Sequence, residues 1–369
     1  MAHSALKLPL PFPIASPVNY TSAQMRIPAH RRFLAVLAST LALSLTLAAQ
    51  ATHTLRIYSI DVEGGQATLF VAPSGASLLV DTGWPGNNGR DADRIQAAMK
   101  DAHITRIDHL LITHFHRDHV GGLPELAKRV PVGEFLDHGE NREDSPDARD
   151  DYAAYLKAIA GKVRRIVHPG DTIEIPGLSI VVLAADGEHI SAIPGIKPVP
   201  NAFCVQEREW PSDSTENARS TGILVTFGKF RLLDMGDLTG AKEVALVCPA
   251  NPIPPVDLYL VTHHGMNLSS SRAIVNAIHP RVAIMNNGTH KAGSPEAWQT
   301  VHDSPGLEDL WMLHTAEGSD AAHNSPEALI ANPKGAVADG AGLVVAAWPN
   351  GSFSVTNTRT GLVKQYPRK

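Results

Sequence analysis

The segment LLITHFHRDHVGG, residues 110–122, carries three histidines and one aspartate within six consecutive positions. It begins inside an apolar run, Ile107 to Ile112, which is typical of a buried strand. In extended backbone, side chains two positions apart point the same way. His114 and His116 can therefore face one point beyond the end of this strand.

The next two polar residues of the segment, Asp118 and His119, come where the chain turns toward a helix, so they can face a second point nearby. Neutral imidazole and carboxylate are ligands for zinc and for related divalent metals. A polar loop with coincidental histidines is the alternative. The pattern H-x-H-x-D-H between an apolar strand and Val-Gly-Gly favours a metal site.

This pattern resembles the signature motif of the metallo-β-lactamase superfamily. The resemblance implies an α/β fold, an αββα sandwich of two mixed β-sheets flanked by helices. It also implies a role for Asp81 in LLVDTG, which matches an earlier aspartate of the family that ends a strand and orients the metal-binding loop. A simple turn-forming Asp-Thr-Gly is the alternative for this residue.

Two later motifs follow in the family's order. LLDMGD places Asp237 where the family has its metal-bridging acidic residue, with Asp234 as the rival inside the apolar run. LYLVTHHG places two histidines at a strand end, where the family has its last histidine ligand. We favour His263, the nearer to the strand, as the ligand. His264 is the alternative ligand, or a neighbouring proton donor.

The resemblance covers most of residues 54 to 290 and indicates a branch of the family. That branch includes the metallo-β-lactamase-like domain of DNA-internalisation competence proteins, which these segments resemble: DVEGGQATLF, ENARSTGILVTFGKFRLLDMGD, VTHHGMNLSSS and HPRVAIMNNGTHKAGSPEAW. The chain departs from the pattern at Glu63 and Gln66. It also has no G-H-T-type histidine between His119 and Asp237, which argues against β-lactam hydrolysis.

Four further residues are candidates for a substrate contact or an extra ligand. Asn217 or His138 could fill part of the place of the missing histidine, although His138 also fits a surface turn. Ser269 lies where a helix opens after the His-His-Gly turn, and it suits either a phosphate oxygen or plain N-capping. His290 lies on a later loop, at the rim of the site or simply on the surface.

The ligand set predicts hydrolysis by a metal-bound hydroxide, because a divalent ion lowers the pKa of bound water toward neutrality. We expect Asp118 and His264 to take part in catalysis, and zinc as one or two ions, with manganese or iron as alternatives. The expected substrate is a phosphoester or phosphodiester. The alternatives are an ester, lactone or β-lactam hydrolase and a non-catalytic metal-binding protein.

The amino-acid composition of the chain limits which kinds of substrate it is expected to bind. The chain has 369 residues, 43% hydrophobic and 19% charged, which is typical of a soluble globular protein. Its formal net charge of -5 argues against a surface built to bind a nucleic-acid backbone, although a local basic groove is compatible with it. We therefore expect a small-molecule or phosphodiester substrate, with nucleic acid unsupported by net charge.

The N-terminus predicts export. Residues 1–51 form an extension with a signal peptide at about 25–51, which has a basic start, an apolar stretch and an Ala-Gln-Ala cleavage site. We expect a secreted or periplasmic protein with no stable membrane anchor after cleavage. Residues 52–369 are expected to form a single hydrolase domain. Cys204 and Cys248 could form a disulfide or remain two unpaired residues.

Overall fold

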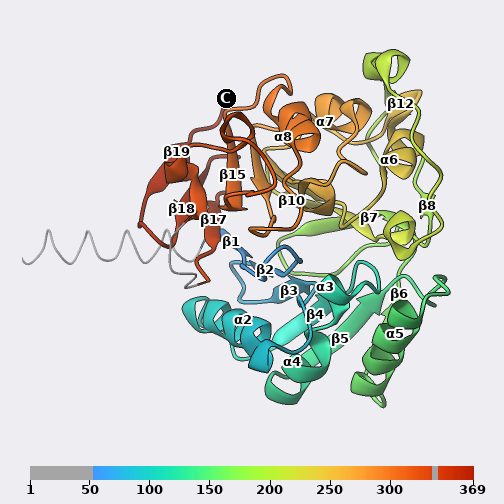
Figure 1. The fold of residues 1–369 in the computed structure, drawn as a ribbon, viewed down its shortest axis with the longest axis vertical. Helices are drawn as coiled ribbons and strands as arrows, with labels where there is room; N and C mark the ends of the chain where they lie inside the picture. The colour runs from blue at the N-terminus through green and yellow to red at the C-terminus, as the bar shows by residue number, and fades with distance from the viewer. Residues whose placement is uncertain (1–52, 335–339) are drawn as a thin grey trace, which may run out of the picture. The chain divides into compact units, whose positions relative to one another are not determined.

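The computed structural model describes residues 53–334 and 340–369. In these ranges the strands form a nine-stranded sheet, an eight-stranded sheet and a two-stranded pair (Figure 1). The predicted signal peptide and the residues before it lie outside the described residues. No helix within the described ranges has both the length and the apolar character needed to span a membrane.

The nine-stranded sheet has the order β19-β18-β17-β1-β2-β3-β4-β5-β6. Its strands are β1 Leu55–Ser59, β2 Thr68–Val71, β3 Ser77–Val80, β4 Ile107–Leu111, β5 Val132–Asp137, β6 Arg164–Ile166, β17 Leu343–Ala347, β18 Phe353–Asn357 and β19 Val363–Tyr366. Pairing is antiparallel from β19 to β3 and parallel from β3 to β6. The sheet is therefore mixed.

The eight-stranded sheet has the order β16-β15-β14-β13-β11-β10-β7-β8 and is also mixed. Its strands are β7 Ser179–Ala185, β8 Glu188–His189, β10 Gly222–Phe227, β11 Phe230–Asp234, β13 Leu258–Leu260, β14 Val282–Met285, β15 Asp309–His314 and β16 Ile330–Asn332. Strands β11, β13, β14, β15 and β16 run parallel. The two-stranded pair joins β9 Val199–Pro200 to β12 Ala250–Asn251.

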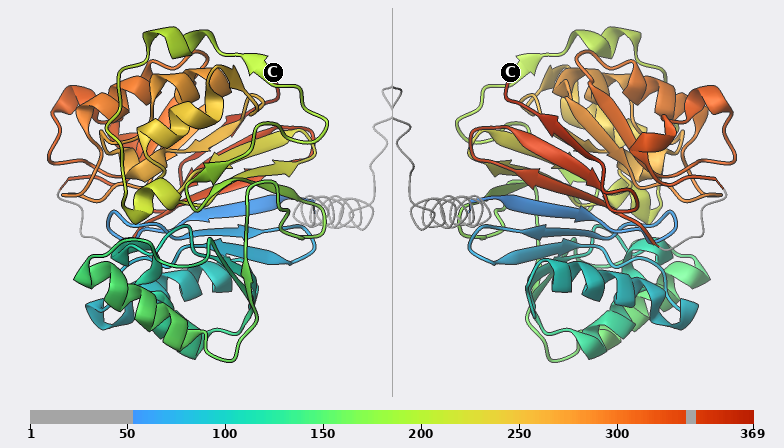
Figure 2. Two further views of the ribbon diagram at one scale, coloured as in Figure 1. Left: turned by 90° about the vertical axis from the view of Figure 1, so that its right-hand side faces the viewer. Right: turned by 90° about the vertical axis from the view of Figure 1, so that its left-hand side faces the viewer.

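Helices cover the outer face of each large sheet, as the two side views of Figure 2 show. The helices are α2 Arg90–Asp101, α3 Arg117–Val120, α4 Leu123–Arg129, α5 Pro146–Ala158, α6 Gly240–Val247, α7 Arg272–Ile278 and α8 Pro295–His302. The cyan and green helices lie outside one sheet, and the yellow and orange helices lie outside the other. This is the expected αββα arrangement.

Alternation of apolar side chains along the strands produces these layers. Leu78 and Val80 pack into the cluster between the two sheets, whereas Leu79 packs against the outer helices. On the second sheet, Leu232 faces the shared core and Leu233 faces α6 and α7. Because each sheet is apolar on both faces, it must be covered on both sides.

Helix starts follow local capping chemistry. Helix α5 begins at Pro146, because the Ser145 hydroxyl accepts a hydrogen bond from the Ala148 amide and proline suits the first turn. Cys204 and Cys248 form a disulfide, which decides between the two alternatives left by the sequence.

Candidate metal centre

The polar motifs follow the carboxyl ends of parallel strands. Asp81 directly follows β3, and the segment with His119 follows β4. On the second sheet, Asp237 follows β11 and His264 follows β13. The carboxyl ends of parallel strands are where open α/β sheets bind ligands. The fold thus brings residues from four separate motifs to one place.

Four buried side chains form a compact donor cluster: Asp118, His119, Asp237 and His264. The Nε2 atom of His119 lies 3.1 Å from Nε2 of His264 and 3.3 Å from Oδ2 of Asp118. It lies equally close, 3.3 Å, to Oδ2 of Asp237. Nε2 of His264 lies 3.2 Å from one oxygen of each carboxylate.

This donor cluster fits one divalent ion. Zinc held tetrahedrally by nitrogen and oxygen at about 2.0–2.1 Å places its donors about 3.3–3.4 Å apart. The separations here, 3.1–3.3 Å, are close to that value, with Asp237 facing His119 through Oδ2 and His264 through Oδ1. The Oδ1 atom of Asp237 is buried and accepts no hydrogen bond from any described residue. Such an acceptor is costly to bury unless a cation or donor satisfies it.

Asp81 fixes the orientation of His119. Its Oδ2 atom lies 2.7 Å from Nδ1 of His119 and accepts a hydrogen bond from the Thr113 hydroxyl at 2.8 Å. Its Oδ1 atom accepts the Thr113 amide at 2.8 Å. A carboxylate oxygen can only accept a hydrogen bond, so Nδ1 of His119 must donate it. The proton of the neutral ring is therefore on Nδ1. The Nε2 lone pair is then directed at the donor cluster.

The two carboxylates of the donor cluster favour a positive charge between them. Burial alone would raise the pKa of Asp118 and Asp237, but their charged and hydrogen-bonding neighbours, His119 foremost, hold both pKa values well below the ordinary range. Burial would lower the pKa of His119, but the carboxylates of Asp237, Asp118 and Asp81 raise it well above its ordinary value. Positive charge is therefore strongly stabilised at this point, as a divalent ion would be.

The structure does not place His263, the preferred ligand, in the donor cluster, and the choice between the two histidines stays a prediction. His264, not His263, joins the donor cluster. His263 lies next to it, with Nε2 3.4 Å from Asp237 Oδ2 and Nδ1 3.0 Å from the Ser269 hydroxyl. Both histidines have left-handed backbone, with φ of 57° and 56°. This backbone turns the second imidazole of the pair inward.

His114 and His116 lie outside the donor cluster, although their rings are only 4.7 Å apart. The Thr113 hydroxyl lies 3.1 Å from Nδ1 of His114, and the buried Nε2 atom of His114 accepts or donates no hydrogen bond within the described residues. Nε2 of His116 lies 2.9 Å from the Glu143 carboxylate. Three of the six predicted ligands thus belong to the donor cluster, and three histidines, His114, His116 and His263, lie outside it.

We compared the sequence with models of known protein families. The sequence model described as the metallo-beta-lactamase superfamily matches residues 61–206. Residues 61–206 thus match the metallo-β-lactamase superfamily. Members of this superfamily bind divalent metals, and the donor cluster is this chain's candidate site.

Relatives in the superfamily have several named activities. The chain is 25% identical over 237 residues to Recombination protein 2 of Haemophilus influenzae, a match that covers 64% of this chain and 24% of that protein. It is 33% identical over 122 residues to Ribonuclease Z of Methanopyrus kandleri, covering 33% of this chain and 39% of that protein. It is 26% identical over 133 residues to a hydroxyacylglutathione hydrolase of Hahella chejuensis, covering 35% and 42%. The chain thus spans less than half the length of each of these relatives, and the hydrolases among them support hydrolysis as its reaction class.

Solved structures of the superfamily are also similar. The metallo-beta-lactamase fold protein YhfI from Bacillus subtilis aligns with 70% of this chain and 96% of its own, at 10% identity and a TM-score of 0.43. The protein Tm1679, described as a metal-dependent hydrolase of the beta-lactamase superfamily, aligns with 70% of this chain and 95% of its own, at 16% identity and a TM-score of 0.41.

The other residues that the sequence analysis named as candidates lie outside the donor cluster. His138 is buried rather than on a surface turn, and its Nε2 lies 3.0 Å from the Glu216 carboxylate. Asn217 Nδ2 lies 3.3 Å from His263 Nε2. His290 is a surface residue, with 81% of its side chain exposed. Asp234, the rival of Asp237, instead accepts a hydrogen bond from Gln66, and burial raises its pKa to about 6.

A second acidic group lies further along the same edge. Asp61, Glu63 and His314 bring their donor atoms together, with His314 Nε2 2.7 Å from Asp61 Oδ1. The guanidinium of Arg94 lies 3.1 Å from the other Asp61 oxygen and 3.5 Å from Glu63. Arg94 already supplies the positive charge here, so we interpret this group as a structural ion-pair network.

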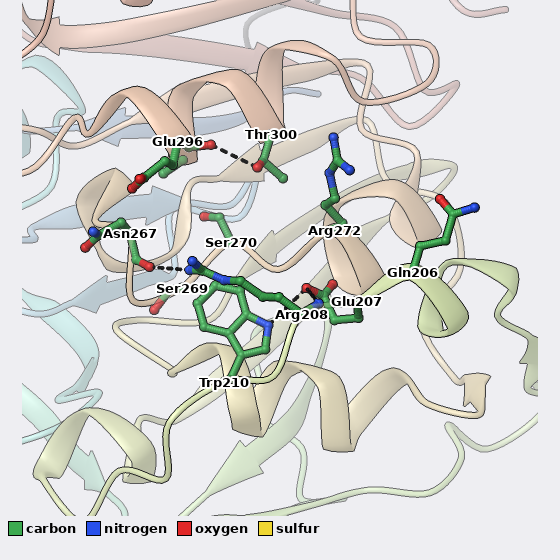
Figure 3. A pocket seen from close by; sticks show the side chains of 11 residues that line it. Gln206, Glu207, Arg208, Trp210, Asn267, Ser269, Ser270, Arg272, Glu296 and Thr300 are labelled. Carbon is green, nitrogen blue, oxygen red and sulfur yellow. Dashed lines mark hydrogen bonds between the residues drawn. The ribbon is translucent and has the colours of Figure 1, made fainter.

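A pocket of about 250 Å³ is lined in part by Asn267, Ser269 and Ser270, which follow the two histidines in the sequence (Figure 3). Its lining includes Ser269, whose hydroxyl contacts His263, and the guanidinium of Arg208, which lies 3.8 Å from the centre of the Trp210 ring. The buried Glu243 carboxylate accepts the amides of the next two serines at 3.1 and 2.6 Å. Burial raises the pKa of Glu243 to about 7.

Sequence reasoning missed three residues of this neighbourhood: Glu143, Glu243 and Lys291. Glu143 reaches His116 from 27 positions away, and Lys291 reaches Asp118 across 173 positions. Neither contact has a local signal in the sequence. Glu243 lies within a helix, where a carboxylate is ordinarily a surface residue.

Proposed function

We propose that this protein is a metal-dependent hydrolase of phosphoester bonds, with its ion held by Asp118, His119, Asp237 and His264. The donor cluster is the observation on which this proposal depends. Two imidazole and two carboxylate donors suit zinc, and they also accept manganese or iron. A bound ion would supply a Lewis acid that acidifies water and polarises a phosphoryl oxygen.

The protein's own residues would orient the donors and move a proton. Asp81 holds the proton of His119 on Nδ1, and Thr113 supports both residues. Burial lowers the pKa of His263 to about 4, so its ring is neutral at physiological pH. Because the Ser269 hydroxyl contacts Nδ1, we assign proton exchange with the substrate to Nε2 of His263, where the substrate would displace the Asn217 amide that lies 3.3 Å away. We therefore propose His263 for the proton-exchange role that the sequence analysis gave to His264.

Phosphoester rather than carbonyl chemistry is supported by two observations. An ammonium group, that of Lys291, contacts a carboxylate of the donor cluster and adds positive charge where an anionic substrate would lie. Of the relatives named above, Recombination protein 2 matches the largest share of this chain, and Ribonuclease Z is named as a nuclease. We propose a small phosphodiester as the substrate, with the end of a nucleic-acid strand as the alternative.

Carbonyl hydrolysis is the second candidate, because some relatives are named for it. The chain is 31% identical over 111 residues to an atrochrysone carboxyl ACP thioesterase of Pseudocercospora fijiensis, which covers 30% of this chain and 32% of that protein. An ester or thioester substrate would need the same ion and an oxyanion contact, but no second anion site.

The test uses mature protein loaded with zinc or manganese and two chromogenic substrates, bis(p-nitrophenyl) phosphate and p-nitrophenyl acetate. We expect the phosphodiester to be hydrolysed with the higher kcat/KM. His264→Ala should lose both bound metal and activity, and the surface variant His290→Ala should retain both. Faster turnover of the neutral ester would favour carbonyl hydrolysis. Full activity of His264→Ala without bound metal would contradict the proposal.

We also propose that residues 52–369 act as one hydrolase domain outside the cytoplasm. The Cys204–Cys248 disulfide supports this location, because such bonds persist in oxidising compartments. Cell fractionation with N-terminal sequencing of the recovered protein tests it. We expect a periplasmic or secreted protein that begins near residue 52. A cytoplasmic protein with an intact N-terminus would contradict this part.

A further inference from the structure

Lys291 is a cation at the edge of the donor cluster. It lies on the loop between β14 and α8, and its ammonium contacts Oδ2 of Asp118. The same oxygen faces the Nε2 atoms of His119 and His264, at 3.3 and 3.2 Å. The ammonium is therefore next to the position proposed for the ion.

The loop that carries Lys291 is held in place by a series of contacts. The Gly288 amide donates to the Lys291 carbonyl at 3.0 Å and closes a tight turn. Asn287 donates through Nδ2 to the Gly288 and His314 carbonyls at 3.2 and 2.8 Å. The Thr289 hydroxyl lies 3.1 Å from Nδ1 of His314. These buried contacts fix where the lysine side chain begins.

A close approach of two backbones also fixes this turn. A Cβ atom on Gly288 would lie 2.8 Å from the carbonyl carbon of Glu63, and one on Gly64 would lie 2.9 Å from the Gly288 amide nitrogen. Only glycine permits this distance at both positions. The turn is consequently pressed against the loop after β1, which the ion-pair network of Asp61 and His314 anchors in turn.

The side chain of Lys291 is oriented as well. Its ammonium lies 4.8 Å from the centre of the Trp84 ring, at a distance typical of a cation–π contact. About a third of the side chain, 32%, is exposed, so a substrate can reach it. A lysine on the surface with no role in binding would need neither the contact with Trp84 nor the turn closed by the Gly288 amide.

The ammonium has hydrogen-bonding capacity to spare. It carries three N–H donors, and across residues 53–334 and 340–369 its one hydrogen-bond acceptor is Asp118 Oδ2. A divalent ion would balance the two negative charges of Asp118 and Asp237. The positive charge of Lys291 would then remain available to a further anion.

We propose that Lys291 binds the anionic group of the substrate and gives the site its preference for phosphate-bearing over neutral substrates. This inference depends on the proposed function for its substrate class. The ammonium keeps one hydrogen bond to Asp118 and donates a second to a non-bridging phosphate oxygen. The alternative is that Lys291 only orients Asp118.

The test measures inorganic phosphate binding by calorimetry to the zinc-loaded protein, so it does not require turnover. Lys291→Gln should weaken phosphate binding about 10- to 100-fold, as expected for loss of a hydrogen bond between charged groups. Lys291→Arg should restore most of the affinity. The control Lys128→Gln removes the same charge from an exposed helix position, where the lysine pairs with Glu125, and should bind phosphate like the wild type.

Zinc affinity of the same variants separates the two roles. If Lys291 binds the substrate anion, Lys291→Gln should bind zinc with near wild-type affinity. Weaker zinc binding with unchanged phosphate binding to the loaded protein would show an orienting role and overturn the inference. Absence of phosphate binding in the wild type would overturn it too. Hydrolysis of phosphodiesters is measured in a separate assay. Its result tests the proposed function and does not test the role of Lys291.

Discussion

Replacement of Asp81 by asparagine tests how the protein prepares His119 for an ion. In the native structure, Asp81 Oδ2 lies 2.7 Å from Nδ1 of His119, which keeps the ring proton on that atom. In Asp81→Asn, the carbonyl oxygen is needed to accept the Thr113 amide, so the NH2 group, which can only donate, replaces the oxygen next to His119. His119 would then have to accept at Nδ1 and carry its proton on Nε2, the atom directed at the donor cluster.

The magnitude follows from the hydrogen bond that is lost. A hydrogen bond to a charged group contributes about 1.5–3 kcal/mol, and each 1.4 kcal/mol is about tenfold in an equilibrium constant. We therefore expect Asp81→Asn to weaken zinc binding about 10- to 100-fold. Competition with a chromophoric chelator measures this affinity directly.

A matched control separates this effect from general damage to the fold. Asp137 is as buried as Asp81 and is hydrogen-bonded to Arg164 and Tyr155, away from the donor cluster. Asp137→Asn should destabilise the fold and leave the zinc affinity of the folded protein nearly unchanged. Wild-type zinc affinity in Asp81→Asn, or an equal loss in Asp137→Asn, would refute the reasoning.

Three further predictions concern stability and the second histidine. Burial raises the pKa of Glu243 from 4.5 to about 7, so the stability it contributes is fully present below about pH 4.5 and is lost, by about 3 kcal/mol, as the pH rises to 7. Glu243→Gln should remove this slope in urea unfolding between pH 5 and pH 8, and parallel profiles for both proteins would contradict it. The Cys204→Ser/Cys248→Ser variant should lose about 4 kcal/mol of unfolding free energy, because the bridge spans 44 positions, and an unchanged denaturation midpoint would exclude this. His263→Ala should retain its metal in elemental analysis but lose most hydrolysis, whereas loss of the metal would make His263 a ligand.

Much of the fold could be predicted from local patterns. The apolar run Ile107 to Ile112 indicated a buried strand, and the structure has β4 at Ile107–Leu111. The resemblance of the motifs implied the αββα sandwich, which the two large sheets and their outer helices form. The order of the strands could not be derived locally, because it depends on pairing between distant segments such as β1 and β17.

The candidate site was predictable where its donors are close in the sequence. Spacing alone pointed to Asp118 and His119, and the family resemblance pointed to Asp237. The structure brings these three residues together, and their role as ligands stays a prediction. The preference for His263 as the ligand stays a prediction, and the structure places His264 in the donor cluster instead. Because both residues have positive φ, distance from the strand does not reveal which ring joins the cluster. Lys291 was missed because its position depends on contacts with loops far away in the sequence.

The most direct test of the central claim is a crystal structure of zinc-soaked protein with anomalous diffraction recorded at the zinc edge. We predict an anomalous peak within bonding distance, about 2.0–2.2 Å, of donors from Asp118, His119, Asp237 and His264. Absence of a peak at full zinc loading, or a peak held by other residues, would contradict the account.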